Sequence, residues 1–189
     1  MPPTPIAGIF VGGAASRMGG QPKGMLRVPD GRTIIERWRA TLDATGVAEV
    51  ILVGVHPAYS ALGLEALEDE PHGIGPLGGL VALLKRAGTA QALALACDMP
   101  FVSRGLLERI LAAPDAPVVA SRIGDRWEPL CARYDATRVL PVAHRHVNTG
   151  DHSLQRLLDE VGAAELPLLP REAEELRDWD TPADARAGR

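Results

Sequence analysis

The sequence predicts a single α/β domain over residues 1–189, built on a mostly parallel sheet. Continuous apolar runs at 6–11, 50–53 and 92–97 are typical of strands that helices cover on both faces. Between the first two runs, the segment 33–44 repeats apolar residues at helical spacing, at Ile34, Ile35, Trp38 and Leu42. This order of strand, helix and strand within a short stretch is typical of the beginning of a parallel sheet.

The rest of the chain continues the alternation of helices and strands. We expect helices at 80–86, 104–112, 136–146 and from about Ser153 to near Gly162, and strands at 118–120 and 127–134. Ser103 is a candidate N-cap for the second of these helices, and Ser153 or Asp151 for the last. A strand end at 178–180 and a helix starting after Thr181 would close the domain.

Composition excludes several classes of protein. With 20 basic and 24 acidic residues the net charge is −4, which argues against a dedicated nucleic-acid surface. Cys97 and Cys131 form no C-x-x-C pair, so neither zinc nor a disulfide is expected and a reducing, cytoplasmic setting fits. No export signal and no run of about 18 apolar residues is present, so we expect no contact with a membrane.

A glycine-rich loop follows the first strand and organises these predictions. Between Phe10 and Lys23 it carries four glycines and Arg17. Glycines let successive backbone N–H groups approach anionic oxygens, and the two cations add fixed positive charge. The pattern matches neither the dinucleotide fingerprint G-x-G-x-x-G nor the ATPase loop, because Lys23 stands between Pro22 and Gly24. The loop is predicted to hold nucleotide phosphates.

A second glycine-rich segment spans residues 67–80. Its glycines would let the backbone approach a flat ligand such as a purine base or its ribose: Gly73, Gly75, Gly78 and Gly79. The alternative is a tight turn in which small residues leave room for helix packing.

Asp98 ends the apolar run 92–97, at the carboxyl edge where open α/β folds bind ligands. It is a candidate Mg²⁺ ligand facing substrate phosphates, or else a turn or capping residue. Asp178 and Asp180 alternate along an extended stretch, so one of them could meet Asp98 across a divalent ion. The histidines lack carboxylates at ligand spacing and are expected to be solvated: His144, His146 and His152.

These motifs resemble, in order along nearly the whole chain, those of the MobA-like nucleotidyltransferases of the molybdenum cofactor guanylyltransferase type. They are G-G-x-x-x-R-M-G-x-x-x-K at 12–23, G-P-L-x-G at 75–79, C-D-M-P at 97–100 and P-L-x-x-x-Y at 129–134. The chain departs from the family at Ala15, often serine there, and at His56, in a region that often has asparagine near the nucleotide. D-x-D-T-P at 178–182 also replaces the commoner N-x-N-T-P.

The resemblance implies a Rossmann-like nucleotidyltransferase fold with about seven strands and Mg²⁺-dependent transfer of GMP from GTP to molybdopterin, releasing pyrophosphate. It implies catalytic roles for Arg17, Lys23 and Asp98, and a metal site at Asp98 and Asp180 with Asp178 as the alternative. The implied nucleotide contacts are Phe10, Val11, Gly12, Gly13, Lys23, Asp69, Gly75, Gly79 and Asp98. Candidate contacts with the pterin or its phosphate, or else ordinary surface residues, are Arg122, Arg126 and Trp127.

Three alternatives stay open. The D-x-D-T-P end favours a cytidylyltransferase acting on the same cofactor, whereas G-P-L-G-G disfavours it. A sugar-phosphate nucleotidyltransferase would share the first loop and Asp98, but such enzymes are usually longer. The third alternative is a non-enzymatic nucleotide-binding protein that works with molybdoenzyme-assembly partners.

Overall fold

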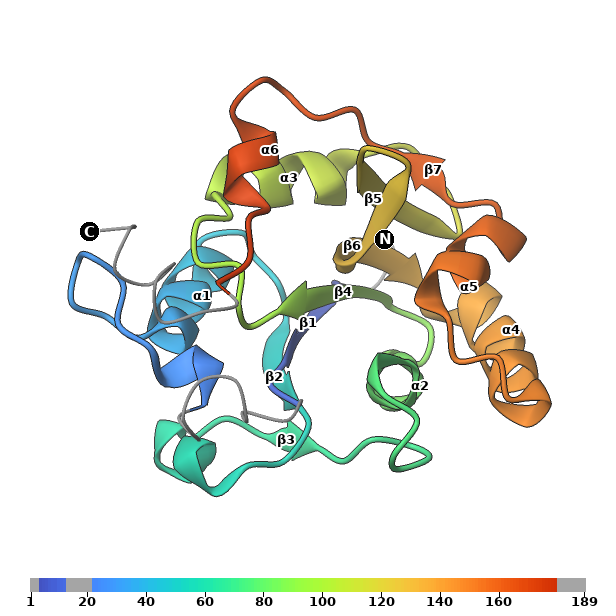
Figure 1. The fold of residues 1–189 in the computed structure, drawn as a ribbon, viewed down its shortest axis with the longest axis horizontal. Coiled ribbons are helices and arrows are strands. Elements are labelled where there is room, and N and C mark those ends of the chain that lie inside the picture. The colour runs from blue at the N-terminus through green and yellow to red at the C-terminus, as the bar shows by residue number, and fades with distance from the viewer. Residues whose placement is uncertain (1–3, 13–21, 180–189) are drawn as a thin grey trace.

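The computed structural model describes residues 4–12 and 22–179. Within them, seven strands form one sheet in the order β3-β2-β1-β4-β6-β5-β7 (Figure 1). The strands are β1 (Ile6–Phe10), β2 (Glu49–Val53), β3 (Ala66–Leu67), β4 (Gln91–Ala96), β5 (Val118–Ile123), β6 (Arg126–Asp135) and β7 (Ala164–Glu165).

Most neighbouring strands run in parallel. β1 lies between β2 and β4, with Phe10 paired to Val53 on one side and Ala96 on the other. β3 is parallel to β2, and β7 is parallel to β5. Only β6 is antiparallel to its neighbours, β4 and β5, among the strands in the described residues. The predicted fold class, a mostly parallel sheet flanked by helices, is confirmed.

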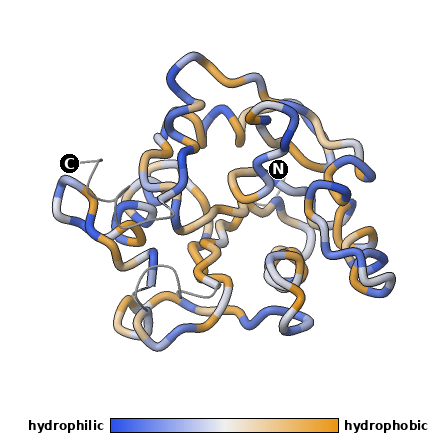
Figure 2. The backbone as a smooth tube through the Cα atoms, in the orientation of Figure 1, coloured by the Kyte–Doolittle hydropathy of each residue, from blue (hydrophilic) through white to orange (hydrophobic). Residues whose placement is uncertain are grey.

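Helices cover both faces of the sheet. They are α1 (Ile34–Asp43), α2 (Pro76–Ala87), α3 (Arg104–Ala112), α4 (Ala136–Thr149), α5 (Leu154–Glu160) and α6 (Glu172–Glu175), with short 3₁₀ turns η2 (Lys23–Met25) and η3 (Pro57–Leu62). α2, α4 and α5 pack into one apolar core, and α1 and α3 into a second on the opposite face. Figure 2 shows hydrophobic residues along the central strands, between these helices. No helix in the described ranges is long and apolar enough to span a membrane.

Most predicted boundaries agree within a few residues, and the cap predictions are confirmed. α3 has the predicted bounds, and the Ser103 hydroxyl accepts a hydrogen bond from the Leu106 amide at 3.2 Å. Ser153 caps α5 in the same way. Two boundaries were wrong. The helix expected from residue 80 begins at Pro76, a residue suited to a first helical turn. Residues 178 and 179 do not form the end of a strand, whereas residue 180 and the helix expected after Thr181 lie outside the described residues.

One histidine prediction was also wrong. His146 is buried rather than solvated, with 5% of its surface exposed. Its Nδ1 lies 3.1 Å from the Asp151 carbonyl oxygen, and its Nε2 lies 2.7 Å from the Glu160 carboxylate. The ring therefore joins the end of α4 to α5, a contact between segments that ligand spacing along the chain does not reveal.

The early start of α2 places two glycines inside the helix. Gly78 lies directly against the segment 69–71, and its carbonyl accepts a hydrogen bond from the Glu70 amide at 3.0 Å. A Cβ atom at Gly78 would overlap the carbonyl oxygen of Pro71. The absent side chain therefore lets the backbone that follows β3 pack on the first turn of α2.

We predict that Gly78→Ala lowers the free energy of unfolding by about 1–3 kcal/mol, because the added methyl meets backbone that cannot easily move. Gly105→Ala is the matched control: it lies in the first turn of α3, where the nearest atom to an added Cβ is 3.7 Å away. Its stability should rise by up to about 1 kcal/mol. Urea denaturation measures both, and equal effects would contradict the packing explanation.

Candidate functional site

The carboxyl ends of β1, β2 and β4 meet at one edge of the sheet. The Val11 amide donates to the Val53 carbonyl at 2.9 Å, and the Cys97 amide donates to the Phe10 carbonyl at 3.1 Å. Gly54 has φ +98°, and a Cβ there would lie 2.9 Å from the Gly12 nitrogen. The end of β1, where the predicted phosphate loop begins, is thus hydrogen-bonded to β2 on one side and to the residue after β4 on the other.

Three predicted nucleotide contacts lie at this edge with different exposure. Phe10 and Val11 are buried, so they meet the edge mainly through their backbone. Gly12 is exposed, and a Cβ built on it would meet no atom of the described residues within 4 Å. Among these three residues, Gly12 is thus the one whose surface is accessible. Gly13, Arg17 and Asp180 lie outside the described residues, so their predicted roles stay predictions.

An ion pair brings two of the predicted catalytic residues together. Lys23 Nζ lies 2.8 Å from Asp98 Oδ2, and about a quarter of each side chain is exposed, at 25% and 22%. Lys23 opens η2, whereas Asp98 follows β4, so the pair spans 75 residues of sequence. A cation and a carboxylate in contact at this edge are suited to a phosphorylated ligand and its metal ion.

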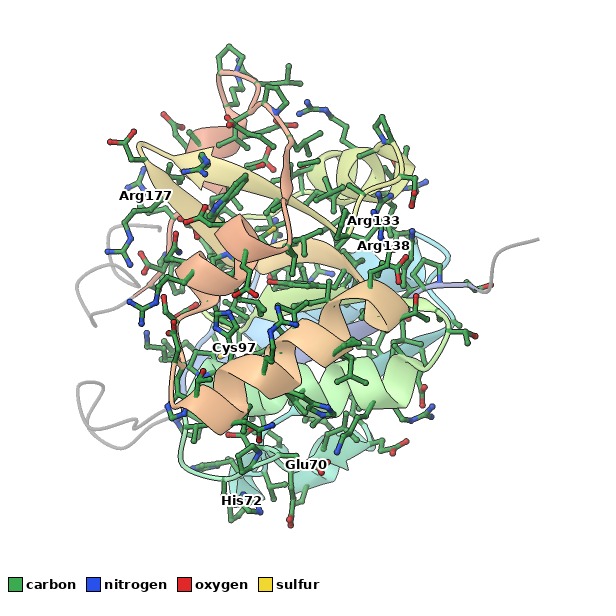
Figure 3. The ribbon with its side chains drawn as sticks, turned by 90° about the vertical axis from the view of Figure 1, so that its right-hand side faces the viewer. Glu70, His72, Cys97, Arg133, Arg138 and Arg177 are labelled. Atoms are coloured by element: carbon green, nitrogen blue, oxygen red, sulfur yellow. The ribbon has the colours of Figure 1, made fainter. Side chains whose placement is uncertain are left out.

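The second predicted ligand segment follows β3 and enters α2. Asp69 is half-buried, and burial raises the pKa of its carboxyl, with His72 acting in the opposite direction. Gly75 is the exposed residue before α2, with φ +73° and open space around its Cβ position. In Figure 3, Glu70 and His72 mark this segment at the margin of the molecule.

Gly79 lies in the buried first half of α2. A Cβ there would lie 2.6 Å from Val53, 2.9 Å from Phe10 and 3.2 Å from the Asp69 carboxylate. The helix-packing alternative raised for this glycine-rich segment thus accounts for Gly78 and Gly79, whereas Gly75 and Asp69 remain accessible from the surface.

Sequence reasoning missed Glu128. β6, which carries Glu128, runs antiparallel to β4, the strand that Asp98 follows. Burial, together with the charges of Asp178 and Asp98 and against that of Arg126, raises the pKa of the Glu128 carboxyl to about 7. The carboxylate within the largely apolar stretch 127–134 could have indicated a functional residue. The sequence alone, however, does not show which strand lies beside it.

The backbone also brings the segment that contains Asp178 toward Asp98. The Trp179 amide donates to the Asp98 carbonyl at 2.8 Å. Carboxylate oxygens are the donors that Mg²⁺ prefers, so Asp98 with its acidic neighbours fits such an ion. In the part of the chain that the structure describes, no group of three His, Cys, Asp or Glu residues is arranged to hold a metal. The predicted partnership of Asp98 with Asp180 is thus untested.

Two of the proposed pterin contacts have structural partners. Trp127 is buried, and its indole N–H donates to the Asp159 carboxylate at 2.8 Å. The guanidinium of Arg122 stacks over this ring, 3.7 Å from its centroid. These contacts tie the β5–β6 hairpin to α5. Arg126 is exposed.

The fold and this edge define an open α/β protein of the kind that binds phosphorylated ligands at the carboxyl ends of its parallel strands. The family model described as "MobA-like NTP transferase domain" matches residues 7–165. The chain belongs to this family of nucleotidyltransferases.

Relatives in sequence support this membership. The molybdenum cofactor guanylyltransferase of Pseudomonas putida is 33% identical over 84% of this chain and 83% of that protein. A probable molybdenum cofactor guanylyltransferase of Opitutus terrae is 32% identical over 95% and 92%. The Xanthomonas euvesicatoria molybdenum cofactor guanylyltransferase is 35% identical over 68% of this chain, and the match spans 64% of its own length.

Solved structures share the fold. The molybdopterin-guanine dinucleotide biosynthesis protein A of Archaeoglobus fulgidus has a TM-score of 0.77 at 21% identity, over 97% of this chain and 96% of its own. The 2-C-methyl-D-erythritol 4-phosphate cytidylyltransferase of Thermus thermophilus has a TM-score of 0.68 at 20% identity, over 96% and 95%. The fold is thus common to proteins named for different nucleotides.

We predict that Glu128→Gln changes how stability depends on pH. The folded-state pKa of about 7 lies above the ordinary value of 4.5, so the wild type loses stability as pH rises from 4.5 through 7. At pH 5, near the start of this window, the variant should therefore gain little stability relative to the wild type, and at pH 8, above the window, it should gain about 1–2 kcal/mol more.

Urea denaturation in EDTA at pH 5 and pH 8 measures this difference. Glu174→Gln, on the exposed side of α6, controls for the amide substitution itself. A Glu128→Gln variant whose stability runs parallel to the wild type across this range would contradict the prediction.

Proposed function

We propose that the protein transfers GMP from GTP to the terminal phosphate of molybdopterin, with Mg²⁺ and with release of pyrophosphate. The Lys23–Asp98 ion pair carries the proposal, because it supplies a cation and a carboxylate at the sheet edge where β1 ends and the predicted phosphate loop begins. Relatives at 32–35% identity that are named molybdenum cofactor guanylyltransferases favour this nucleotide and acceptor.

The reaction requires mainly that the acceptor phosphate and GTP are positioned correctly and that the negative charge on their phosphates is neutralised. An oxygen of the acceptor phosphate attacks the α-phosphorus of GTP and forms a new P–O–P bond. The bond from the α-phosphorus to the bridging oxygen breaks, and pyrophosphate leaves with its electron pair. Mg²⁺ would neutralise charge on the phosphates as this happens.

The residues of the chain would divide this work. Lys23, with Arg17, attracts the triphosphate and stabilises the charge that builds up on the leaving group. The backbone from Phe10 to Gly13 cradles the phosphates. Asp98, with Asp180 or Asp178, would hold Mg²⁺. Asp69 and Gly75, with Gly79 behind them, face the base or ribose.

The proposed setting is the cytoplasm, because the two cysteines of the chain, Cys97 and Cys131, are buried free thiols. The product would pass to molybdoenzymes, so assembly proteins that receive it are possible partners. Neither nucleic acid nor a membrane has a part in the reaction.

One observation favours a second candidate, cytidylyl transfer to the same acceptor. The sequence 178–182 reads D-W-D-T-P where the guanylyltransferases commonly have asparagines. A carboxylate in place of an amide changes the charge close to the proposed metal ion. The sugar-phosphate and non-enzymatic alternatives rest on shared motifs alone.

We predict that the purified protein with Mg²⁺ and molybdopterin releases pyrophosphate from GTP at least about tenfold faster than from CTP, UTP or ATP, a preference of about 1.4 kcal/mol. A coupled pyrophosphate assay with each nucleotide, with and without molybdopterin, measures nucleotide and acceptor together. Faster release from CTP would replace the guanylyl proposal with the cytidylyl one. Nucleotide binding without any release would favour the non-enzymatic alternative.

Asp98→Ala should lower the rate of pyrophosphate release by at least about 10²-fold, because it removes both the proposed metal ligand and the partner of Lys23. Asp43→Ala, an exposed aspartate at the end of α1, is the matched control and should keep the wild-type rate. Circular dichroism verifies that both variants fold. Retained turnover in Asp98→Ala would refute its role.

A further inference from the structure

A buried polar cluster lies beside the Lys23–Asp98 ion pair and has no part in the mechanism above. It consists of the Tyr59 phenol, the Gly24 amide and the Cys97 thiol. The Gly24 amide donates to the Tyr59 oxygen at 3.2 Å, and Tyr59 is only 3% exposed. Cys97 is also buried, and burial raises the pKa of its thiol.

Two members of the cluster are neighbours in sequence of the Lys23–Asp98 pair. Gly24 follows Lys23 in η2, and Cys97 precedes Asp98 after β4. Tyr59 comes from a third segment, η3, which follows β2. Figure 3 shows Cys97 within the body of the molecule.

The contact between Tyr59 and the lysine turn is close. A Cβ atom at Gly24 would lie 3.0 Å from the Tyr59 oxygen and 2.7 Å from Ile35. The turn itself is only three residues long, and Pro22 before it provides no side-chain cap. Its backbone hydrogen bonds involve the Met25 and Leu26 amides, whereas the Gly24 amide is held by Tyr59. The phenol therefore supports the turn at its centre.

Tyr59 is itself held firmly in η3. His56 caps this turn, since its Nδ1 accepts from the Ala58 amide at 3.2 Å. The His56 and Tyr59 rings meet edge to face with centroids 5.7 Å apart. A side chain held in this way can fix the position and orientation of a short turn that packs on it, as η2 packs on Tyr59.

We propose that Tyr59 is a positioning residue for Lys23. Through the Gly24 amide its hydroxyl sets the turn that directs the Lys23 ammonium toward Asp98 and toward the triphosphate. The inference rests on the proposed phosphate-binding role of Lys23, but not on the identity of the base or the acceptor. Removing the hydroxyl keeps every charge in the site and leaves a buried amide without its oxygen partner, which favours displacement of the turn.

The test compares Tyr59→Phe with Tyr134→Phe. Tyr134 is also fully buried, and its hydroxyl donates to the Pro129 carbonyl at 2.7 Å, but it lies in the core on the opposite face of the sheet. Each variant loses one buried phenol hydrogen bond, so both should melt at lower temperature. Lys23→Met serves as the reference for complete loss of the lysine.

Two measurements separate positioning from general destabilisation. Amide hydrogen exchange over residues 22–26 should accelerate at least about tenfold in Tyr59→Phe and stay unchanged in Tyr134→Phe. The dissociation constant for inorganic tripolyphosphate with Mg²⁺, measured by calorimetry, should rise about tenfold in Tyr59→Phe alone, and further in Lys23→Met.

Unchanged exchange over residues 22–26 in Tyr59→Phe would overturn the inference, as would equal effects of the two phenylalanine variants. Accelerated exchange with unchanged tripolyphosphate binding would also overturn it, because the turn would then move without consequence for Lys23. Failure of the guanylyl proposal looks different: tripolyphosphate binding and its loss in Tyr59→Phe persist, while GTP and molybdopterin give no pyrophosphate.

Discussion

The site depends on the way the carboxyl ends of β1, β2 and β4 are held together. Hydrogen bonds from Val11 to Val53 and from Cys97 to Phe10 fix the three ends at one level. The Lys23–Asp98 ion pair then joins the segment after β1 to the segment after β4. A partly exposed ion pair contributes little to stability by itself. The pair matters instead for the position of its two charges, which mark where a phosphate and a cation could bind side by side.

Glycine contributes to this edge in two physically different ways. At Gly12 and Gly75 the missing side chain leaves open space at the surface, which suits the approach of a ligand to the backbone. At Gly24, Gly78 and Gly79 the same absence lets other parts of the protein pack against the backbone. A glycine-rich sequence therefore does not by itself distinguish a binding loop from close packing, and the neighbours of each glycine decide between them.

Features that depend on local sequence patterns could be predicted, whereas those that depend on neighbours in space could not. The fold class followed from apolar periodicity. Lys23 and Asp98 were singled out as candidates because their motifs follow strands β1 and β4, and the structure brings the two side chains into contact. The start of α2 at Pro76 was missed because glycines disfavour helices when they are considered alone. Glu128, Tyr59 and the buried His146 were missed for another reason. Their roles depend on strand register and on packing between distant segments, which local spacing does not encode.

The balance of charge around Asp98 bears on how the site would accept its ligand. Asp98 is paired with Lys23, and Glu128 and Asp178 are further acidic groups close to it. The charges of Asp178 and Asp98 add to the effect of burial in raising the pKa of the Glu128 carboxyl. A triphosphate that approached this edge without a cation would meet these carboxylates. The same carboxylates attract a divalent ion, which can offset the charge of both protein and substrate. Under the proposed function, the nucleotide would therefore enter as its magnesium complex, and Lys23 would exchange a carboxylate oxygen for a phosphate oxygen.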